Sequence, residues 1–165
     1  MKQLRLIPKP KLSNGGSLQN TRQTQRILSH RKPIHLVLKS KKTHNLFRHR
    51  SGIQNLLINQ AHKFNITLHT WSIQKDHVHI SLKIPNRESY IKFIRAFTGL
   101  MARKLGKGLW TQRPFTRVLS GSQKDFWNLN NYIFRNEMEV FGIWKLSDRR
   151  RSGWPPTRTQ IFHRF

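Results

Sequence analysis

Two histidines separated by one residue, His77 and His79, are the first candidates for chemistry in this 165-residue chain. Residues two apart on a β-strand project from the same face, so both imidazoles could reach one metal ion. Val78, Ile80 and Leu82 alternate with them and would face a core. The spacing alone is a weak signal, because two exposed sheet histidines give the same pattern. The strict alternation favours the metal-ligand interpretation.

A second candidate group is a row of polar side chains near the end of the chain. Asn128, Tyr132 and Asn136 are four residues apart and would form one line along a helix. A tyrosine flanked by asparagines on its own row is not typical of packing, although a core or interface tyrosine is the alternative. A separate apolar stripe is expected to face the core and consists of Phe126, Leu129 and Ile133.

The acidic residues and cysteines limit the kinds of metal site that are possible. Only six Asp and Glu residues are present, scattered along the chain, and there is no cysteine. Two-metal nucleases hold their ions mainly with clustered carboxylates, and thiolate sites need cysteine. Any metal bound here is therefore expected to depend on neutral ligands, meaning histidine and amide oxygen.

The charge indicates the partner. Thirty-two Lys and Arg residues give a formal net charge of +26, which would attract a polyanion such as nucleic acid. On charge alone, a ribosomal-type or chromatin-type protein that only binds nucleic acid is the favoured interpretation. No apolar run reaches the roughly 20 residues of a membrane span, and the start lacks the apolar segment of a secretory signal. We therefore expect no membrane partner and a cytoplasmic, nucleoid-associated location.

The remaining histidines and aromatic residues have less specific interpretations. His35 and His69 lie on predicted strands, where a structural role is favoured over a role at the site. Tyr90 has an isoleucine rather than an amide four residues later, which favours packing. Four tryptophans could stack on unpaired bases, although packing is the expected role for most of them: Trp110, Trp127, Trp144 and Trp154.

Hydrophobic periodicity predicts strand, helix, strand, strand, helix, strand, helix. The predicted elements span residues 34–39, 46–64, 66–73, 77–84, a helix from an N-cap at Asn86 to Gly106, 115–119 and 125–138. The first six match an α+β, ferredoxin-like plan, an antiparallel sheet with helices on one face, whose other face is expected to be open. We expect a flexible basic arm (1–30), a catalytic domain (31–143) and a basic tail (144–165).

Two segments resemble a known family. Residues 76–82 (DHVHISL) resemble the histidine–hydrophobic–histidine signature of HUH endonucleases. Residues 131–136 (NYIFRN) resemble the nucleophile helix of single-tyrosine transposases, most of all the REP-associated tyrosine transposases. The likeness covers residues 33–142 and includes the stretch 110–118. Two positions differ: Asp76 stands where relatives often have asparagine, and Glu137 where many carry proline.

This resemblance implies an HUH endonuclease fold, in which a C-terminal helix carries the nucleophile Tyr132. It implies a divalent ion, Mg²⁺ or Mn²⁺, bound by His77, His79 and Asn136, although imidazole could also take Zn²⁺. It further implies a transposase that cuts and rejoins single-stranded or hairpin DNA through a 5′-phosphotyrosine. Phosphate contacts are expected from Arg95, Arg103, Lys104, Arg113, Arg117 and Arg135.

Two other interpretations and two assembly states are left open by the sequence. A degenerate HUH domain would bind hairpin DNA without cutting it, and a ribosome-associated protein would bind RNA. The chain is expected to act as a monomer or as a homodimer that shares active sites between subunits.

Overall fold

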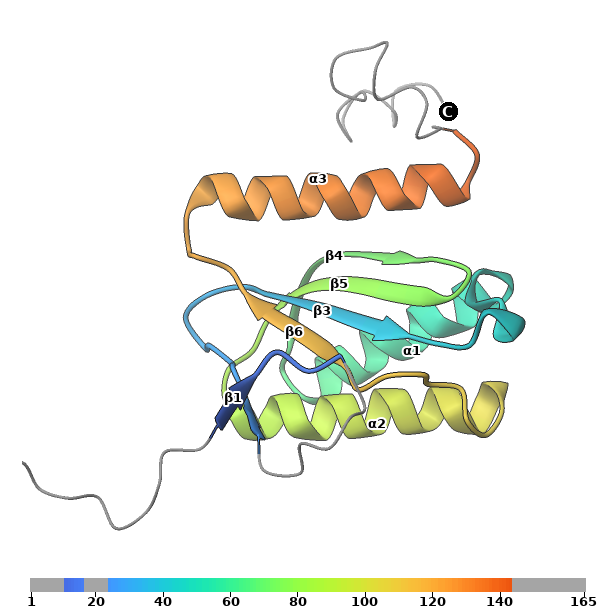
Figure 1. Cartoon of the computed structure of the whole chain (residues 1–165), viewed down its shortest axis with the longest axis horizontal. Helices are drawn as coiled ribbons and strands as arrows, with labels where there is room; N and C mark the ends of the chain where they lie inside the picture. Colours follow the sequence, from blue (N-terminus) through green and yellow to red (C-terminus); the bar gives the residue numbers. More distant parts are fainter. Residues whose placement is uncertain (1–10, 17–23, 144–165) are drawn as a thin grey trace, which may run out of the picture.

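A computed structural model describes residues 11–16 and 24–143 of the chain. These residues form three layers: a single helix, a four-stranded sheet and a pair of helices on the opposite side (Figure 1). The predicted basic tail, residues 144–165, lies outside the described residues.

The sheet has the strand order β4-β5-β3-β6, and all its neighbouring strands are antiparallel. Its strands are β3 (Ile34–Lys39), β4 (Thr67–Ile73), β5 (His77–Lys83) and β6 (Phe115–Val118). The two central strands are therefore the first and third of the predicted set. This order confirms the ferredoxin-like arrangement expected from the sequence.

Helices α1 (Arg50–Lys63) and α2 (Arg87–Leu105) cover one face of the sheet. The Asn86 side chain accepts a hydrogen bond from the Ser89 N–H, so the predicted N-cap is present. The helix predicted over 46–64 begins as a short 3₁₀ helix, η2 (Leu46–His49), and becomes α-helical at Arg50; another 3₁₀ helix, η1 (Lys42–His44), precedes it.

The main core lies between this face and the two helices. The inward residues of the strands are almost fully buried there, and so are Phe93 and Phe97 of α2. The rings of these two phenylalanines stack at a centroid distance of 5.8 Å. Strand residues that supply the core are Ile34, Leu36, Leu38, Val78, Ile80 and Leu82.

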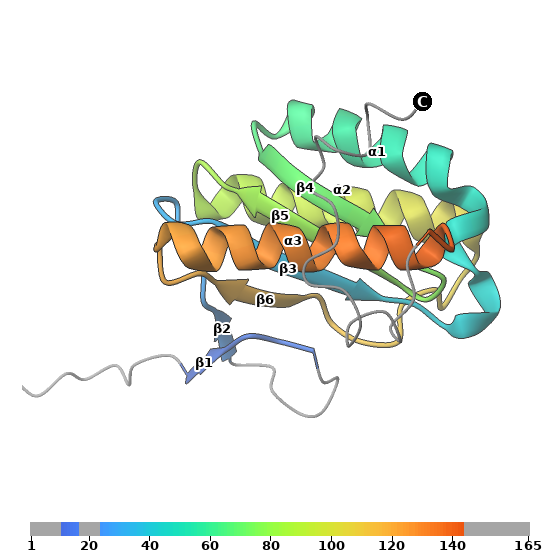
Figure 2. The same ribbon diagram turned by 90° about the horizontal axis from the view of Figure 1, so that it is seen from above.

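Helix α3 (Gln123–Val140) covers the other face of the sheet, which corrects the expectation that this face would be open. It begins at Ser122, whose side chain accepts a hydrogen bond from the Asp125 N–H. Its buried residues Leu129 and Ile133 pack with Phe126 and Leu119 in a second, smaller core. The predicted apolar stripe therefore does face inward, and α3 lies over the strands in Figure 2.

The N-terminal segment is more regular than predicted. Two short strands, β1 (Lys11–Ser13) and β2 (Thr24–Arg26), pair in parallel inside the expected flexible arm. The Asn14 carbonyl oxygen accepts a hydrogen bond from the Thr116 N–H at 2.8 Å, which ties this segment to β6. Backbone pairing therefore orders a stretch that has no hydrophobic period. None of the helices between residues 24 and 143 is long and apolar enough to cross a membrane.

Candidate active site

The candidate site lies between the sheet and α3, around the imidazole of His79. This side chain is 5% exposed, and its ring centroid lies 4.7 Å from His77 and 5.3 Å from Tyr132. Strand alternation places both histidines on the face that α3 covers. The fold therefore brings Tyr132 next to His77 and His79, which precede it by more than 50 residues in the sequence.

A third imidazole fixes the orientation of His79. His35 on β3 stacks on it, and a hydrogen bond of 3.1 Å joins His35 Nε2 to His79 Nδ1. Burial lowers the pKa of His79 to about 3, with further contributions from His77 and His35. Burial also lowers the pKa of His35 to about 4, and the charge of Arg117 adds to the shift. Both rings are therefore neutral at physiological pH.

Asp76 is the hydrogen-bond partner of His77, as His35 is of His79. The Nδ1–H of His77 donates a hydrogen bond of 2.7 Å to the Asp76 carboxylate. Partial burial acts to raise the pKa of Asp76, but the hydrogen bond and charge of His77 outweigh it, so the pKa lies below its usual value. This carboxylate leaves the lone pair of His77 on Nε2.

Tyr132 combines contact with the histidines and access to solvent. Its side chain is 42% exposed although the ring lies edge-on to His79 and also to His35. The phenol and these imidazoles all come from one chain.

Asn136 lies one helical turn after Tyr132, but its side chain makes no hydrogen bond to either histidine within the described part of the chain. Its Nδ2 is buried without a hydrogen-bond partner among the described residues. Its backbone oxygen accepts a hydrogen bond of 2.6 Å from the Gln74 side chain. Gln74 therefore holds the helix at the position that carries this amide.

A second anchor holds the last turns of α3. The Arg50 guanidinium pairs with Glu137 and lies over the Phe141 ring, 4.5 Å from its centroid. Phe47 packs edge-on against the same ring at 5.5 Å. Glu137, one of the two positions that differ from the family pattern, thus connects α3 to the start of α1.

The donor chemistry of the site fits a divalent ion. His79 Nε2 is buried and has no hydrogen-bond partner in the part of the chain that is described. In the tautomer of His79 whose Nδ1–H donates to His35, Nε2 carries a lone pair, as metal binding requires. Within residues 11–16 and 24–143 no three His, Cys, Asp or Glu side chains group as metal ligands. The predicted ligand set is not a group of this kind, because it consists of two histidines, His77 and His79, and the side-chain amide of Asn136.

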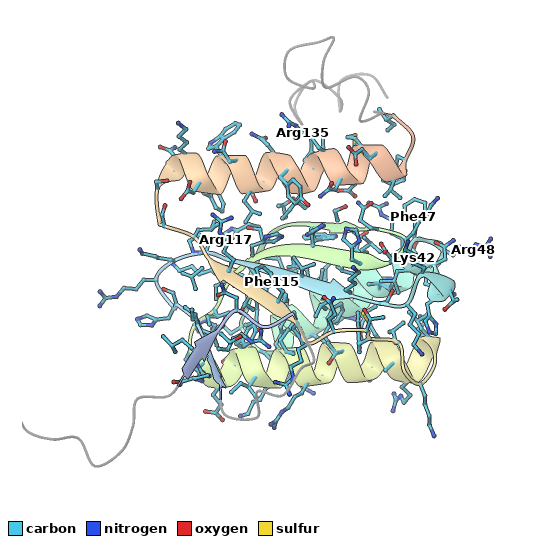
Figure 3. The ribbon with its side chains drawn as sticks, in the orientation of Figure 1. Lys42, Phe47, Arg48, Phe115, Arg117 and Arg135 are labelled. Atoms are coloured by element: carbon cyan, nitrogen blue, oxygen red, sulfur yellow. The ribbon has the colours of Figure 1, made fainter. Side chains whose placement is uncertain are left out.

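The predicted DNA-contacting residues divide between the two sides of the sheet. Arg117 on β6 and Arg135 on α3 lie on the Tyr132 side (Figure 3). Arg113 precedes β6 and lies near Arg26, whose pKa is lowered mainly by burial. The other three were expected near the site, but they belong to α2, which covers the opposite face of the sheet: Arg95, Arg103 and Lys104.

The other candidates occupy varied places. Tyr90 is 5% exposed and belongs to the main core, as predicted. The ring centroids of His69 and Phe126 of α3 lie 5.0 Å apart. Trp127 is exposed, and the indole N–H of Trp110 donates a hydrogen bond to the Thr98 carbonyl oxygen. Trp144 and Trp154 lie outside the described residues. Sequence reasoning underestimated His35 and Asp76, although adjacency to the HxH pair could have indicated Asp76.

Comparison with known proteins identifies the family. The family model of IS200-like transposases matches residues 29–134, which include His77, His79 and Tyr132 but not Asn136. A solved REP-associated tyrosine transposase bound to a REP hairpin is similar, with 13% identity and a TM-score of 0.59 over 82% of this chain and 89% of that chain.

A proposed transposase from Deinococcus radiodurans R1 is 19% identical, with a TM-score of 0.47 over 70% of this chain and 98% of that one. No curated protein matches the chain. The first structural likeness agrees with the fold described above, and the family match covers well over half of the sequence. The chain therefore belongs to the family of IS200-like transposases.

Proposed function

We propose that this transposase cuts and rejoins single-stranded DNA through a covalent bond between Tyr132 and a 5′-phosphate. The observation that carries the proposal is the position of the half-exposed phenol against a buried, unpartnered His79. A nucleophile needs access to its substrate, and a metal-binding imidazole needs a free lone pair. Both conditions hold within one chain.

The residues around the site have separate parts in this proposal. His77, His79 and Asn136 would hold Mg²⁺ or Mn²⁺, and that ion would offset negative charge on the scissile phosphate. Asp76 holds His77 in the tautomer that leaves Nε2 free, and His35 would do the same for His79 by accepting its Nδ1–H. Arg117 on β6 and Arg135 on α3 would contact the phosphate backbone of a strand bound at Tyr132.

The covalent step exchanges one phosphate ester for another. The phenol oxygen of Tyr132 attacks phosphorus, the bond from phosphorus to the 3′ oxygen breaks, and the phenol proton is lost to solvent. The departing 3′ oxygen takes up a proton and becomes a free 3′-OH. The phosphotyrosine ester retains the energy of the broken bond, so a 3′-OH of another strand can reverse the step.

The substrate proposal is DNA that contains a hairpin, with cleavage in the adjacent single strand. Its supports are the net charge of +26 and the fold shared with a REP-associated tyrosine transposase bound to a REP hairpin. Action on such DNA would place the protein on the nucleoid.

A labelled-substrate experiment tests the proposal. Hairpin oligonucleotides with random single-stranded flanks carry one dye at the 3′ end and another at the 5′ end. Incubation with Mn²⁺ or Mg²⁺ should yield a protein–DNA adduct that survives SDS and carries only the 3′ dye, because the 5′-phosphate stays on Tyr132. The 5′ dye should leave on a fragment with a free 3′-OH.

Two variants complete this test. Tyr132→Phe should form no adduct, whereas Tyr90→Phe, which removes the other tyrosine hydroxyl of the chain, should form it normally. Adduct formation by Tyr132→Phe would assign the nucleophile elsewhere. Tight hairpin binding with no adduct in any metal would identify a degenerate domain, and chelator-insensitive RNA binding would identify an RNA-binding protein.

A further inference from the structure

A pocket of about 330 Å³ lies beside the start of α3, and neither His77 nor His79 lines it. The ends of β4 and β5 and the segments before β3 and after β6 also contribute to its walls. The proposed covalent step gives this pocket no role. Residues that decide its chemistry are the cations Arg31 and Lys83, the rings of His69 and Phe126, and Ser122 and Gln123 at the start of the helix.

The polar side of this pocket is built for an anion. Arg31 and Lys83 are both exposed, and no carboxylate in the described part of the chain pairs with either. The only acid in the first turn of α3, Asp125, accepts a hydrogen bond from Ser120 and does not line the pocket. The first N–H groups of an 18-residue helix add positive potential at the same place.

The other side of the pocket is aromatic and can form hydrogen bonds. The β4–β5 register shifts between Leu68 and Thr70, so His69 is the extra residue of a bulge, a feature that re-aims side chains. Its Nε2 is buried with no partner in the described residues, and its ring lies edge-on to Phe126. Burial and then the charge of Lys83 lower the pKa of His69, which favours the neutral ring.

We propose that this pocket binds one unpaired nucleotide of the DNA strand that Tyr132 attacks. The phosphate lies between Arg31 and Lys83, and the base lies against Phe126 within hydrogen-bonding reach of His69. An inorganic anion would need the cations but not the rings. This inference rests on the proposed function, because it assumes that the strand at Tyr132 is DNA.

The size and place of the pocket agree with a single nucleotide. Its volume is at the lower end of the roughly 300–1,000 Å³ range of ligand pockets, which leaves no room for a base pair. Phe126 precedes Tyr132 by six residues on α3, a rise of about 9 Å. The bound nucleotide would therefore belong to the single-stranded flank close to the scissile phosphate, which gives the pocket a part in choosing the cleavage position.

The phosphate contacts can be tested by binding in the absence of cleavage. In the Tyr132→Phe background, the Arg31→Ala/Lys83→Ala protein should bind a 12-nucleotide oligo(dT) about tenfold more weakly at 0.1 M salt. The slope of the logarithm of the binding constant against the logarithm of the salt concentration should become shallower by about 0.7 to 1.4, because each lost phosphate contact contributes about 0.7 on single strands. Lys63→Ala/Lys107→Ala is the matched control, with the same charge change at the ends of α1 and α2 on the other face of the sheet, and should change both quantities far less. Equal effects of the two pairs would overturn the proposal.

The base contact needs a separate arm. Abasic sites placed one at a time along a hairpin oligonucleotide should weaken binding most at one flank position, and His69→Ala should remove that dependence on position. A pocket that takes only a phosphate ion would show no such position, and the nucleotide assignment would be wrong. Adduct formation by the protein with Tyr132 intact is measured independently. Normal adducts with no pocket effect reject only the pocket, and a pocket effect with no adducts rejects only the proposed cleavage.

Discussion

The two faces of the sheet are built from the same four strands and differ in almost every physical property. One face presents aliphatic residues to α1 and α2 and forms the larger core. The other face presents histidines and serines to α3, and the apolar packing between this face and the helix is limited to a small cluster around Leu129 and Ile133. Stability is therefore concentrated on the first face, and the second can keep polar groups with unused hydrogen-bonding capacity.

The buried polar atoms sharpen this contrast. His79 Nε2 and Ser81 Oγ both lie on the α3 face of β5, and neither has a hydrogen-bond partner in the described part of the chain. Leaving such atoms unpaired costs roughly 1–3 kcal/mol each. A fold can carry this cost when the opposite face supplies enough apolar burial. We interpret the α3 face as a surface that is prepared for a ligand.

The largest effect on stability is expected on the α1–α2 face. Phe93→Ala removes a fully buried ring that stacks on Phe97 and should lower the free energy of unfolding by about 3–5 kcal/mol. Urea unfolding followed by circular dichroism measures it. Protein that stays folded should keep its Mn²⁺ affinity, and a large loss of that affinity would show that the two faces are not independent.

A smaller effect is expected from the core under α3. Leu129→Ala should cost about 2 kcal/mol, the lower end for a buried leucine, because its cluster is small and the side chain is 9% exposed. Hydrogen exchange should accelerate in α3 and remain slow in β3 and β5. Faster exchange throughout the sheet would mean that α3 belongs to the same cooperative unit as the main core.

The Asp76→Asn variant tests the polar face without disturbing packing. The amide oxygen can still accept the His77 Nδ1–H, as the asparagine of relatives would, but it lacks the negative charge that raises the basicity of His77 Nε2. Mn²⁺ affinity should therefore fall by about tenfold, the lower end for a loss of this kind. Isothermal titration calorimetry with Mn²⁺ measures this, and Asp125→Asn, an acid outside the site, is the control. Unchanged affinity would show that the charge of Asp76 does not strengthen a metal ligand. The unfolding midpoint should move little in either variant.

The smallest effect is expected at the Arg50–Glu137 pair. Glu137→Gln keeps a hydrogen-bonding group but removes the charge, and partly exposed ion pairs contribute about 0–1 kcal/mol. Local fraying of the last turn of α3 should increase, as measured by hydrogen exchange of residues 137–141. If exchange there is unchanged, the pair does not anchor the helix.

Much of the fold could be predicted because local patterns fix it. The alternation through His77 to Lys83 predicted β5, the asparagine before α2 predicted the start of that helix, and the order of the elements predicted the ferredoxin-like arrangement. The coverage of the second face by α3 was missed, because periodicity shows that a helix has an apolar stripe but does not show which surface receives it. The β1–β2 pair was not predicted for a related reason, because strands held together by backbone hydrogen bonds alone need no hydrophobic period.

The site was predictable where spacing within one element decides it. The HxH pair and the Asn128–Tyr132–Asn136 row are of this kind. His35 could not be ranked above other strand histidines, because its contact with His79 depends on the pairing of β3 with β5, where Val37 is opposite His79. Likewise, no feature of the sequence separates Arg117 from Arg95, which the fold places on opposite sides of the sheet.

We propose that His77, His79, Asn136 and Tyr132 of one chain surround a single divalent ion. Anomalous diffraction from crystals soaked in Mn²⁺ would locate that ion. We expect one strong peak within bonding distance of Nε2 of both histidines and of the Asn136 amide oxygen, on the side of the Tyr132 hydroxyl. A peak elsewhere, or none at saturating Mn²⁺ with His79 Nε2 bonded to another protein group, would contradict it.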